Sequence, residues 1–191
     1  MLFYTAHYDS PLGGITLASD GEALVGLWFD GQKYFADAIV GQSVTDNPSL
    51  PVFADTRRWL DLYFSGMQPD FTPRLRMLTT PFRQAVWEIM LSIPYGKTMT
   101  YGEIAKHIAG QKGIPQMSAQ AVGGAVGHNS ISLIIPCHRV VGTDGSLTGY
   151  AGGIAKKVRL LQLEGTNMSR FIRCCFYWGN PKHLQKHKIR K

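Results

Sequence analysis

A stretch rich in glycine and proline, Gly66 to Pro73, divides the 191-residue chain into two parts with different sequence patterns. Before it, turn residues separate three β-rich runs, which predicts strands at residues 2–8, 14–18 and 23–29. Apolar positions at helical spacing then predict a helix over residues 50–64. The first part therefore mixes strands with a helix, and we expect a boundary near residues 75 to 80.

The second part opens with a helix-start signal, because Thr80 can cap a helix whose first residue is Pro81. Apolar residues recur there at three- and four-residue intervals, so one face of this helix should be buried. We expect the helix to continue until Pro94 stops it.

Two shorter helices are expected next. A capping-box pattern at Thr100 predicts a helix over residues 101–109, ended by Gly110. A run of small residues predicts another helix at about 118–127. Together they indicate a helix-turn-helix at about 101–127, and the alternative is that the small-residue helix is simply packed inside the protein.

Charge is unevenly distributed along the chain. Residues 1–79 carry 5 basic and 9 acidic side chains, whereas residues 80–165 carry 8 and 4. The second part is therefore the one expected to meet a polyanion such as nucleic acid. Residues 166–191 carry seven Lys or Arg and no acid, which accounts for the formal net charge of +7.

Export and membrane insertion are not indicated. No apolar run approaches the roughly 20 residues that cross a bilayer, and the first nine residues lack the features of a signal peptide. We expect a cytoplasmic protein without a membrane partner. The three cysteines, Cys137, Cys174 and Cys175, are an odd number and are expected to be thiols.

The residues with the clearest chemical potential are Cys137, His138 and Arg139, which follow an apolar run. A thiol has a pKa near 8.5, so a neighbouring base or positive charge is needed to raise the share of thiolate at neutral pH. Adjacent side chains rarely face each other, which favours a contact between Cys137 and His138 through water. An inert core cysteine beside a solvated His-Arg pair is the alternative.

The motifs around this segment resemble those of the O6-alkylguanine-DNA alkyltransferases, also called methylated-DNA–protein-cysteine methyltransferases. The most specific motif is Pro-Cys-His-Arg-Val at residues 136–140. The other landmarks occur in order: Thr100-Tyr101-Gly102, Ala121-Val122-Gly123, Asn129, Gly149-Tyr150, Leu160-Leu161 and Glu164-Gly165. The resemblance is strong over about residues 80–165, and the first part is similar only in its strand-rich layout and length.

The resemblance implies an α+β fold in two domains. Residues 1–78 would form a ribonuclease-H-like mixed domain that serves as a scaffold. Residues 79–166 would form a mainly helical domain with the helix-turn-helix and the active-site cysteine, followed by a basic tail at 167–191. The implied protein is a monomer without cofactor or metal, and its partner is double-stranded DNA that contains O6-alkylguanine.

The implied reaction is a self-inactivating transfer of an alkyl group from guanine O6 to Cys137. A thiolate suits displacement at this soft alkyl carbon. By resemblance, His138 acts on the thiol through water and Glu164 orients His138. Tyr101 donates to the guanine ring, and Asn129 braces the active-site turn.

The implied DNA contacts follow from the place of the lesion inside stacked DNA, which requires the nucleotide to be rotated out of the duplex. The second helix of the helix-turn-helix would enter the minor groove. The residues expected to contact DNA or the flipped base are Gln120, Ala121, Gly123, Gly124, Arg139, Tyr150, Ala151 and Gly152. O4-alkylthymine is a second candidate substrate.

The chain departs from the family pattern at three positions. Gln120 replaces an arginine that fills the gap left by the flipped base, and it brings no charge. Ser130 replaces a proline, which predicts a looser turn before the cysteine. Ala151 replaces a small hydroxyl residue and removes one contact to guanine O6.

Three other functions fit the sequence less well. A damage-recognition protein of the alkyltransferase-like type would lack the cysteine that is present as Cys137. A sequence-specific regulator would carry more base-reading side chains in its recognition helix than Gln120 alone. A thiol hydrolase using Cys137 and His138 ranks last.

The basic tail has three interpretations. It is a DNA-binding appendage, because clustered Lys and Arg neutralise phosphates, or a solvated segment without a chemical role. The third is a zinc site, for which the candidate ligands are Cys174, Cys175, His183 and His187.

Overall fold

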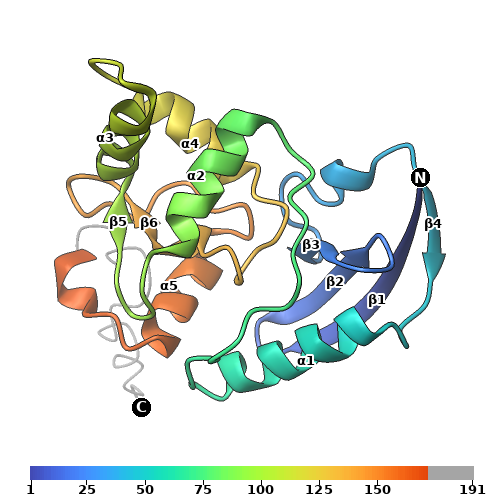
Figure 1. Ribbon diagram of the computed structural model, residues 1–191. Helices are drawn as coiled ribbons and strands as arrows, with labels where there is room; N and C mark the ends of the chain where they lie inside the picture. Colours follow the sequence, from blue (N-terminus) through green and yellow to red (C-terminus); the bar gives the residue numbers. More distant parts are fainter. Residues whose placement is uncertain (172–191) are drawn as a thin grey trace, which may run out of the picture.

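The computed structural model describes residues 1–171, in which a sheet with one long helix lies beside a group of shorter helices (Figure 1). The elements in chain order are β1 (Leu2–Ser10), β2 (Gly13–Ser19), β3 (Leu24–Phe29), the 3-10 helix η1 (Asp37–Ile39), β4 (Ser43–Asp46), α1 (Pro51–Phe64), α2 (Pro81–Leu91), β5 (Met99–Thr100), α3 (Tyr101–Lys112), α4 (Ala119–Gly127), the 3-10 helix η2 (Cys137–Arg139), β6 (Val140–Val141) and α5 (Ile154–Leu163). The α+β class is confirmed. Within residues 1–171, no helix is long and apolar enough to span a bilayer.

The four-stranded sheet has the order β3-β2-β1-β4. Strands β1 to β3 form an antiparallel meander, and β4 pairs parallel with β1. The three predicted strands are confirmed, and β4 is an addition. All four residues of β4 are exposed, so no alternation of buried and exposed side chains marks this strand in the sequence. Helix α1 lies along one face of the sheet (Figure 1).

The predicted helix starts are confirmed more closely than the predicted ends. The Thr80 side chain caps α2, and Thr100 with Glu103 forms the capping box of α3. The prediction that Gly110 ends α3 is wrong. The helix continues to its C-cap Gly113, whose φ of 61° suits a glycine in the left-handed region.

Helix α2 also ends earlier than predicted. Its last residue is Leu91, and Ser92 is its C-cap, so the helix stops before Pro94 rather than at it. A proline clashes with a helical conformation of the residue before it, which favours an end upstream.

The free edge of β3 joins the two parts of the chain. Leu24 forms a parallel bridge with Leu75, at the start of the boundary predicted near residues 75 to 80, and Leu27 forms one with Ile131, in the segment that leads to Cys137. The largest hydrophobic cluster contains residues from the sheet, α1, α2, α3, α4 and α5. One continuous core therefore supports the segment before Cys137, and the domain limits 1–78 and 79–166 stay a prediction.

Hydrogen bonds tie the turn before the cysteine to β3 at Ser130. The amide of Leu27 donates to the carbonyl of Ser130 at 2.8 Å, and the amide of Ser132 donates to the carbonyl of Leu27 at 2.9 Å. The Ser130 hydroxyl is buried and donates to the carbonyl of Val25 at 3.3 Å. These hydrogen bonds to β3 restrain the turn at Ser130, and the looser turn expected from the missing proline stays a prediction.

Candidate active site

The Cys137 thiol lies at the start of η2, is 4% exposed and is a free cysteine, in agreement with its prediction as a thiol. The side-chain amide of Asn129 donates to Sγ at 3.3 Å. Burial raises the pKa of Cys137, and the hydrogen bond from Asn129 offsets only part of this effect. The resting group is therefore the thiol, and its use as a nucleophile requires a base.

Asn129 also holds the backbone turn between α4 and the cysteine. Its Oδ1 accepts from the amide of Ile131 at 3.0 Å, and its Nδ2 donates to the carbonyl of Ile135 at 2.7 Å. Inside this turn Leu133 has a φ of 68°, a conformation that costs energy for a residue other than glycine. The Asn129 side chain offsets this cost by tying both ends of the turn together.

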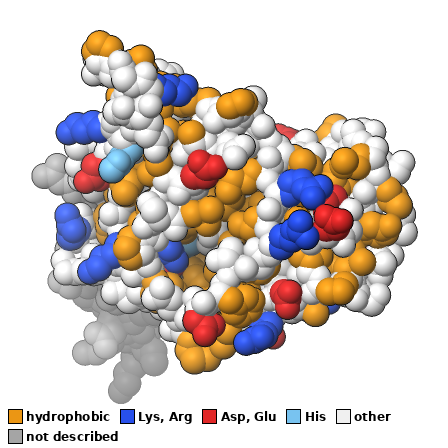
Figure 2. All heavy atoms as spheres, in the orientation of Figure 1, with side chains coloured by type: hydrophobic (Ala, Val, Ile, Leu, Met, Phe, Trp, Pro, Cys, Tyr) orange, Lys and Arg blue, Asp and Glu red, His pale blue; other side chains and the backbone are white. Residues whose placement is uncertain are grey.

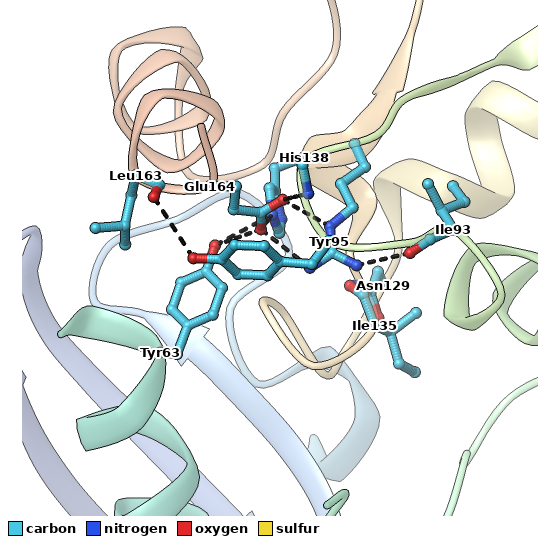
Figure 3. Close-up of polar contacts among 10 residues, drawn as sticks. Tyr63, Ile93, Tyr95, Asn129, Ile135, His138, Leu163 and Glu164 are labelled. Atoms are coloured by element: carbon cyan, nitrogen blue, oxygen red, sulfur yellow. Dashed lines mark hydrogen bonds and ion pairs between the residues drawn. The ribbon is translucent and has the colours of Figure 1, made fainter. Parts of the chain in front are cut away.

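His138 and Glu164 form the central polar pair of the site. His138 Nε2 lies 2.6 Å from Glu164 Oε1, and both side chains are fully buried (Figure 3). Burial alone would raise the pKa of Glu164, but hydrogen bonds and charges from His138 and Arg139 outweigh it and lower this pKa to about 2. An ionised carboxylate can only accept, so Nε2 of His138 carries the proton.

The second ring nitrogen of His138 is therefore an acceptor. His138 Nδ1 is buried and has no hydrogen-bond partner among residues 1–171. Burial lowers the pKa of His138, opposed by its hydrogen bond to Glu164, so the resting imidazole is neutral. The structure records no direct hydrogen bond between the described side chains of Cys137 and His138. A neutral, buried Nδ1 can receive a proton directly or through a water molecule.

Arg139 has a different role from the predicted DNA contact. It is 8% exposed, and its guanidinium donates to Glu164 at 2.8 and 3.1 Å and to the carbonyl of Ile93 at 2.7 Å. A buried guanidinium with these partners is not available to a phosphate. The DNA-contact assignment of Arg139 is corrected to an internal ion pair with Glu164.

Tyr101 is brought beside the cysteine segment by the parallel pairing of β5 with β6, since it directly follows β5. Its hydroxyl donates to the carbonyls of Thr148 and Gly149 at 3.2 and 3.4 Å. Burial and the proximity of Cys137 raise the pKa of Tyr101 to about 12. The hydroxyl is thus a protonated donor. A Cβ at Gly149, whose φ is 65°, would lie 3.0 Å from the Tyr101 hydroxyl, so the absence of a side chain at Gly149 permits the close approach of Tyr101.

Tyr150 lies beside His138 and, with Ala151, lines a cavity together with glycines of α4. Tyr150 is buried, its ring centroid is 6.4 Å from that of His138, and its hydroxyl has no partner in the described part of the chain. The carbonyl of Ala151 accepts from the amide of Lys33 at 3.1 Å. At Gly152 a Cβ would lie 2.8 Å from the Tyr150 ring, so a larger residue would displace that ring.

Helix α4 exposes some of its small residues, although Ala125 is buried. Gln120, Ala121 and Gly124 are exposed, and Gly123 is partly buried. A cavity of about 220 Å³ lies between this helix and the loop residues 33–34 and 149–151. It is lined by Lys33, Tyr34, Gly123, Gly124, Gly127, His128, Gly149, Tyr150 and Ala151.

The surface charge differs between the two parts of the molecule. In Figure 2, basic side chains predominate over the helical part on the left, whereas basic and acidic side chains are interspersed over the sheet part.

Two residues of the site were not predicted. Tyr63 donates to Glu164, and Lys157 is fully buried with its Nζ donating to the carbonyls of Val140 and Thr148 at 2.6 and 2.8 Å. Lys157 thereby ties α5 to β6 and to the loop before Tyr150. Lys157 lies three and four residues before Leu160 and Leu161, a spacing that predicts a place for Lys157 on the buried face of the helix. No local pattern distinguishes Tyr63 from an ordinary core aromatic residue.

The zinc interpretation concerns Cys174, Cys175, His183 and His187, which lie outside the described residues. Within residues 1–171, no group of three or more His, Cys, Asp or Glu side chains is placed to hold a metal ion.

Comparison with known proteins adds independent information about both parts of the chain. Residues 3–77 match the family model "6-O-methylguanine DNA methyltransferase, ribonuclease-like domain", and residues 81–166 match "6-O-methylguanine DNA methyltransferase, DNA binding domain". The chain is 44% identical over 161 residues to the methylated-DNA–protein-cysteine methyltransferase of Mycobacterium tuberculosis, covering 83% of this chain and 92% of that protein. The Haemophilus influenzae protein of the same name is 41% identical over 164 residues, covering 85% and 86%.

Solved structures agree with the sequence matches. The M. tuberculosis O6-methylguanine methyltransferase superimposes with a TM-score of 0.70 at 41% identity, covering 85% of this chain and 92% of that one. The structure of M. tuberculosis OGT in complex with DNA gives a TM-score of 0.69 at 40% identity, covering 90% and 95%. The ribonuclease-like character expected for the first part is confirmed.

Proposed function

The chain belongs to the 6-O-methylguanine DNA methyltransferase family, and we propose that Cys137 is the residue to which it transfers an alkyl group from guanine O6 in duplex DNA. It is a DNA-repair enzyme of the methylated-DNA–protein-cysteine methyltransferase class. The observation that carries the proposal is the buried Cys137 thiol, which accepts a hydrogen bond from Asn129 and is followed by His138. His138 is paired with Glu164 through Nε2, and its Nδ1 atom has no partner among the described residues.

The proposed reaction begins with removal of the thiol proton. Nδ1 of His138 takes this proton, directly or through a water, and Glu164 stabilises the imidazolium that forms. The sulfur then forms a bond to the alkyl carbon while the bond between that carbon and guanine O6 breaks. The electron pair of the broken bond stays on the guanine, and the protein retains a thioether at Cys137, so each chain reacts once.

The guanine anion that leaves must be stabilised as its charge develops. Tyr101 provides a protonated hydroxyl next to Cys137, at present bound to the loop carbonyls of Thr148 and Gly149. We assign to it the hydrogen bond to the guanine ring. Such a donor lowers the barrier because its interaction strengthens as charge appears.

The DNA side of the proposal uses α4 and the loop around Tyr150. The exposed small residues Ala121 and Gly124 allow close approach of the helix to a groove, and Gln120 takes the place vacated by the flipped base. The cavity between α4 and Gly149-Tyr150-Ala151 favours entry of the flipped base beside the site. Readout in the minor groove suits repair at any sequence, because few base-specific contacts are available there.

The test of the proposed function is the intact mass of the protein after incubation with excess duplex oligonucleotide that contains O6-methylguanine, followed by peptide mapping. We expect a gain of one methyl group per chain, located on the peptide that holds Cys137. An undamaged duplex of the same sequence is the control. Tight binding to the lesion without a gain in mass would contradict the proposal and favour a recognition protein.

A Tyr101→Phe variant is expected to transfer methyl groups more slowly by roughly 10- to 100-fold, which corresponds to about 1.4–2.7 kcal/mol of lost transition-state stabilisation. The variant keeps the ring that packs beside Gly123 and loses only the donor. Single-turnover rates at saturating damaged DNA measure the effect. An unchanged rate would remove Tyr101 from the proposed mechanism.

A further inference from the structure

Tyr63 connects the ribonuclease-like part of the chain to the His138–Glu164 pair. It lies near the C-terminal end of α1 and is fully buried. Its hydroxyl lies 2.7 Å from Glu164 Oε1 and 3.2 Å from His138 Nε2 (Figure 3). It is thus the described side chain of α1 that contacts both members of the pair.

The direction of these hydrogen bonds follows from the charge of Glu164. Because the carboxylate is ionised, the Tyr63 O–H must donate to Oε1. The lone pairs of the same oxygen then face His138 Nε2. Nε2 is therefore flanked by two oxygen acceptors, which retain the proton on this nitrogen and leave Nδ1 as the acceptor.

The Tyr63 ring is held rigidly enough to set this geometry. It stacks on Trp59 with centroids 5.1 Å apart and planes at 10°, and it forms T-shaped contacts with Phe64 and Tyr95 at centroid distances of 5.4 and 6.1 Å. The hydroxyl therefore has a fixed position relative to Glu164. Burial raises the pKa of Tyr63 far above its usual value, so the hydroxyl remains a donor.

We propose that Tyr63 is a positioning residue for alkyl transfer, whose hydroxyl holds Glu164 and the Nε2–H tautomer of His138 so that Nδ1 is free to accept the thiol proton. This inference rests on the proposed function of Cys137. It gives the ribonuclease-like part a share in the reaction beyond that of a scaffold. Correct seating of α1 against α5 and η2 then becomes a condition for an active site.

The pH dependence of transfer should report this role. The charged and titratable groups that surround His138 are Glu164, Arg139, Lys157, Cys137, Tyr150 and Tyr63. Without the Tyr63 hydroxyl, Nε2 loses the oxygen acceptor at 3.2 Å, which would lower the pKa of His138. The closer acceptor, Glu164 Oε1 at 2.6 Å, loses a donor at the same time, so its negative charge acts more fully on the imidazole and this second effect outweighs the first. This raises the pKa of His138. The base is then protonated at a higher pH, and the acidic limb of the rate profile moves upward.

The experiment compares Tyr63→Phe with the wild-type protein in single-turnover transfer at saturating O6-methylguanine duplex across a pH series. We expect a maximal rate lower by about 10-fold, an acidic limb shifted to higher pH, and DNA affinity unchanged within about twofold. Phenylalanine preserves the packing with Trp59. A wild-type profile, or a shift to lower pH, would overturn the proposal.

Tyr95→Phe is the matched control. The Tyr95 hydroxyl donates to the carbonyl of Leu163 at 3.5 Å, and its ring lies beside Tyr63. We expect its rate and pH profile to match those of the wild type, and an equal loss in both variants would overturn a specific role for Tyr63. Independently of any variant, ¹⁵N NMR of the wild-type protein should find His138 as the Nε2–H tautomer, and the Nδ1–H tautomer would refute the proposal. Failure of the wild-type protein to gain a methyl group at Cys137 would refute the proposed function instead.

Discussion

A Cys137→Ser variant should bind duplex DNA with O6-methylguanine as tightly as the wild-type protein, yet gain no methyl group. A serine hydroxyl ionises far less readily than a thiol, so His138 cannot generate a comparable nucleophile. We expect the single-turnover rate to fall by at least about 10³-fold, or about 4 kcal/mol in barrier height. Binding should survive because Cys137 is 4% exposed, whereas Gln120, Ala121 and Gly124 of α4 are exposed.

Intact-mass measurement of the reacted protein and a fluorescence titration with labelled duplex separate these two outcomes. The matched control is the double variant Cys174→Ser, Cys175→Ser, which removes the other two thiols of the chain and should gain one methyl group at the wild-type rate. Methyl transfer by Cys137→Ser would identify another acceptor. Loss of DNA binding in this variant would contradict the separation between the buried thiol and the exposed helix.

The features that could be predicted from the sequence are those encoded locally. Capping residues such as Thr80 and Thr100 mark helix starts because a side chain bonds to the backbone a few residues away. The Cys137-His138-Arg139 motif likewise concentrates the reactive groups in one segment. The resemblance built on this motif gave the pairing of His138 with Glu164, which residue spacing alone could not supply.

The features that escaped prediction depend on contacts between distant segments. Tyr63 and Glu164 are 101 residues apart, and β4 is added to the sheet by parallel pairing without a buried face. The burial of Arg139 depends on Glu164 and on the carbonyl of Ile93, neither of which is adjacent in sequence. A charged residue beside a reactive cysteine suggests a contact with DNA until its partner in the fold is known.

The other large effect is expected for Glu164→Gln, which preserves shape and removes the charge. Oε1 of Glu164 accepts from Tyr63, His138 and Arg139, and Oε2 accepts from Arg139 and from the amide of Gly96. A glutamine must place its NH₂ group at one of these positions. In the place of Oε2, the NH₂ group would face two donors and could bond to neither of them. In the place of Oε1, it would donate to His138 Nε2, and the ring proton would move to Nδ1.

Both placements of the amide impair the protein. The misplaced proton blocks the proposed base, so we expect transfer to slow by roughly 10²- to 10⁴-fold. Arg139 loses its counter-charge in the interior, which should lower the free energy of unfolding by roughly 3–5 kcal/mol. Single-turnover rates and urea denaturation near neutral pH measure the two effects. The control Glu103→Gln alters an exposed capping box and should cost no more than about 1 kcal/mol without slowing transfer.

The stability difference between wild type and Glu164→Gln should itself depend on pH. The pKa of Glu164 is lowered from 4.5 to about 2 in the folded protein, so as pH falls the unfolded chain takes up the proton first. The contribution of the ionised carboxylate is complete above pH 4.5 and is lost as pH falls toward about 2. Urea denaturation should therefore show the two proteins converging over this window. A constant difference would mean that the stability lost in Glu164→Gln does not come from ionisation of Glu164, and the charge-based account of the His138–Glu164–Arg139 cluster would fail.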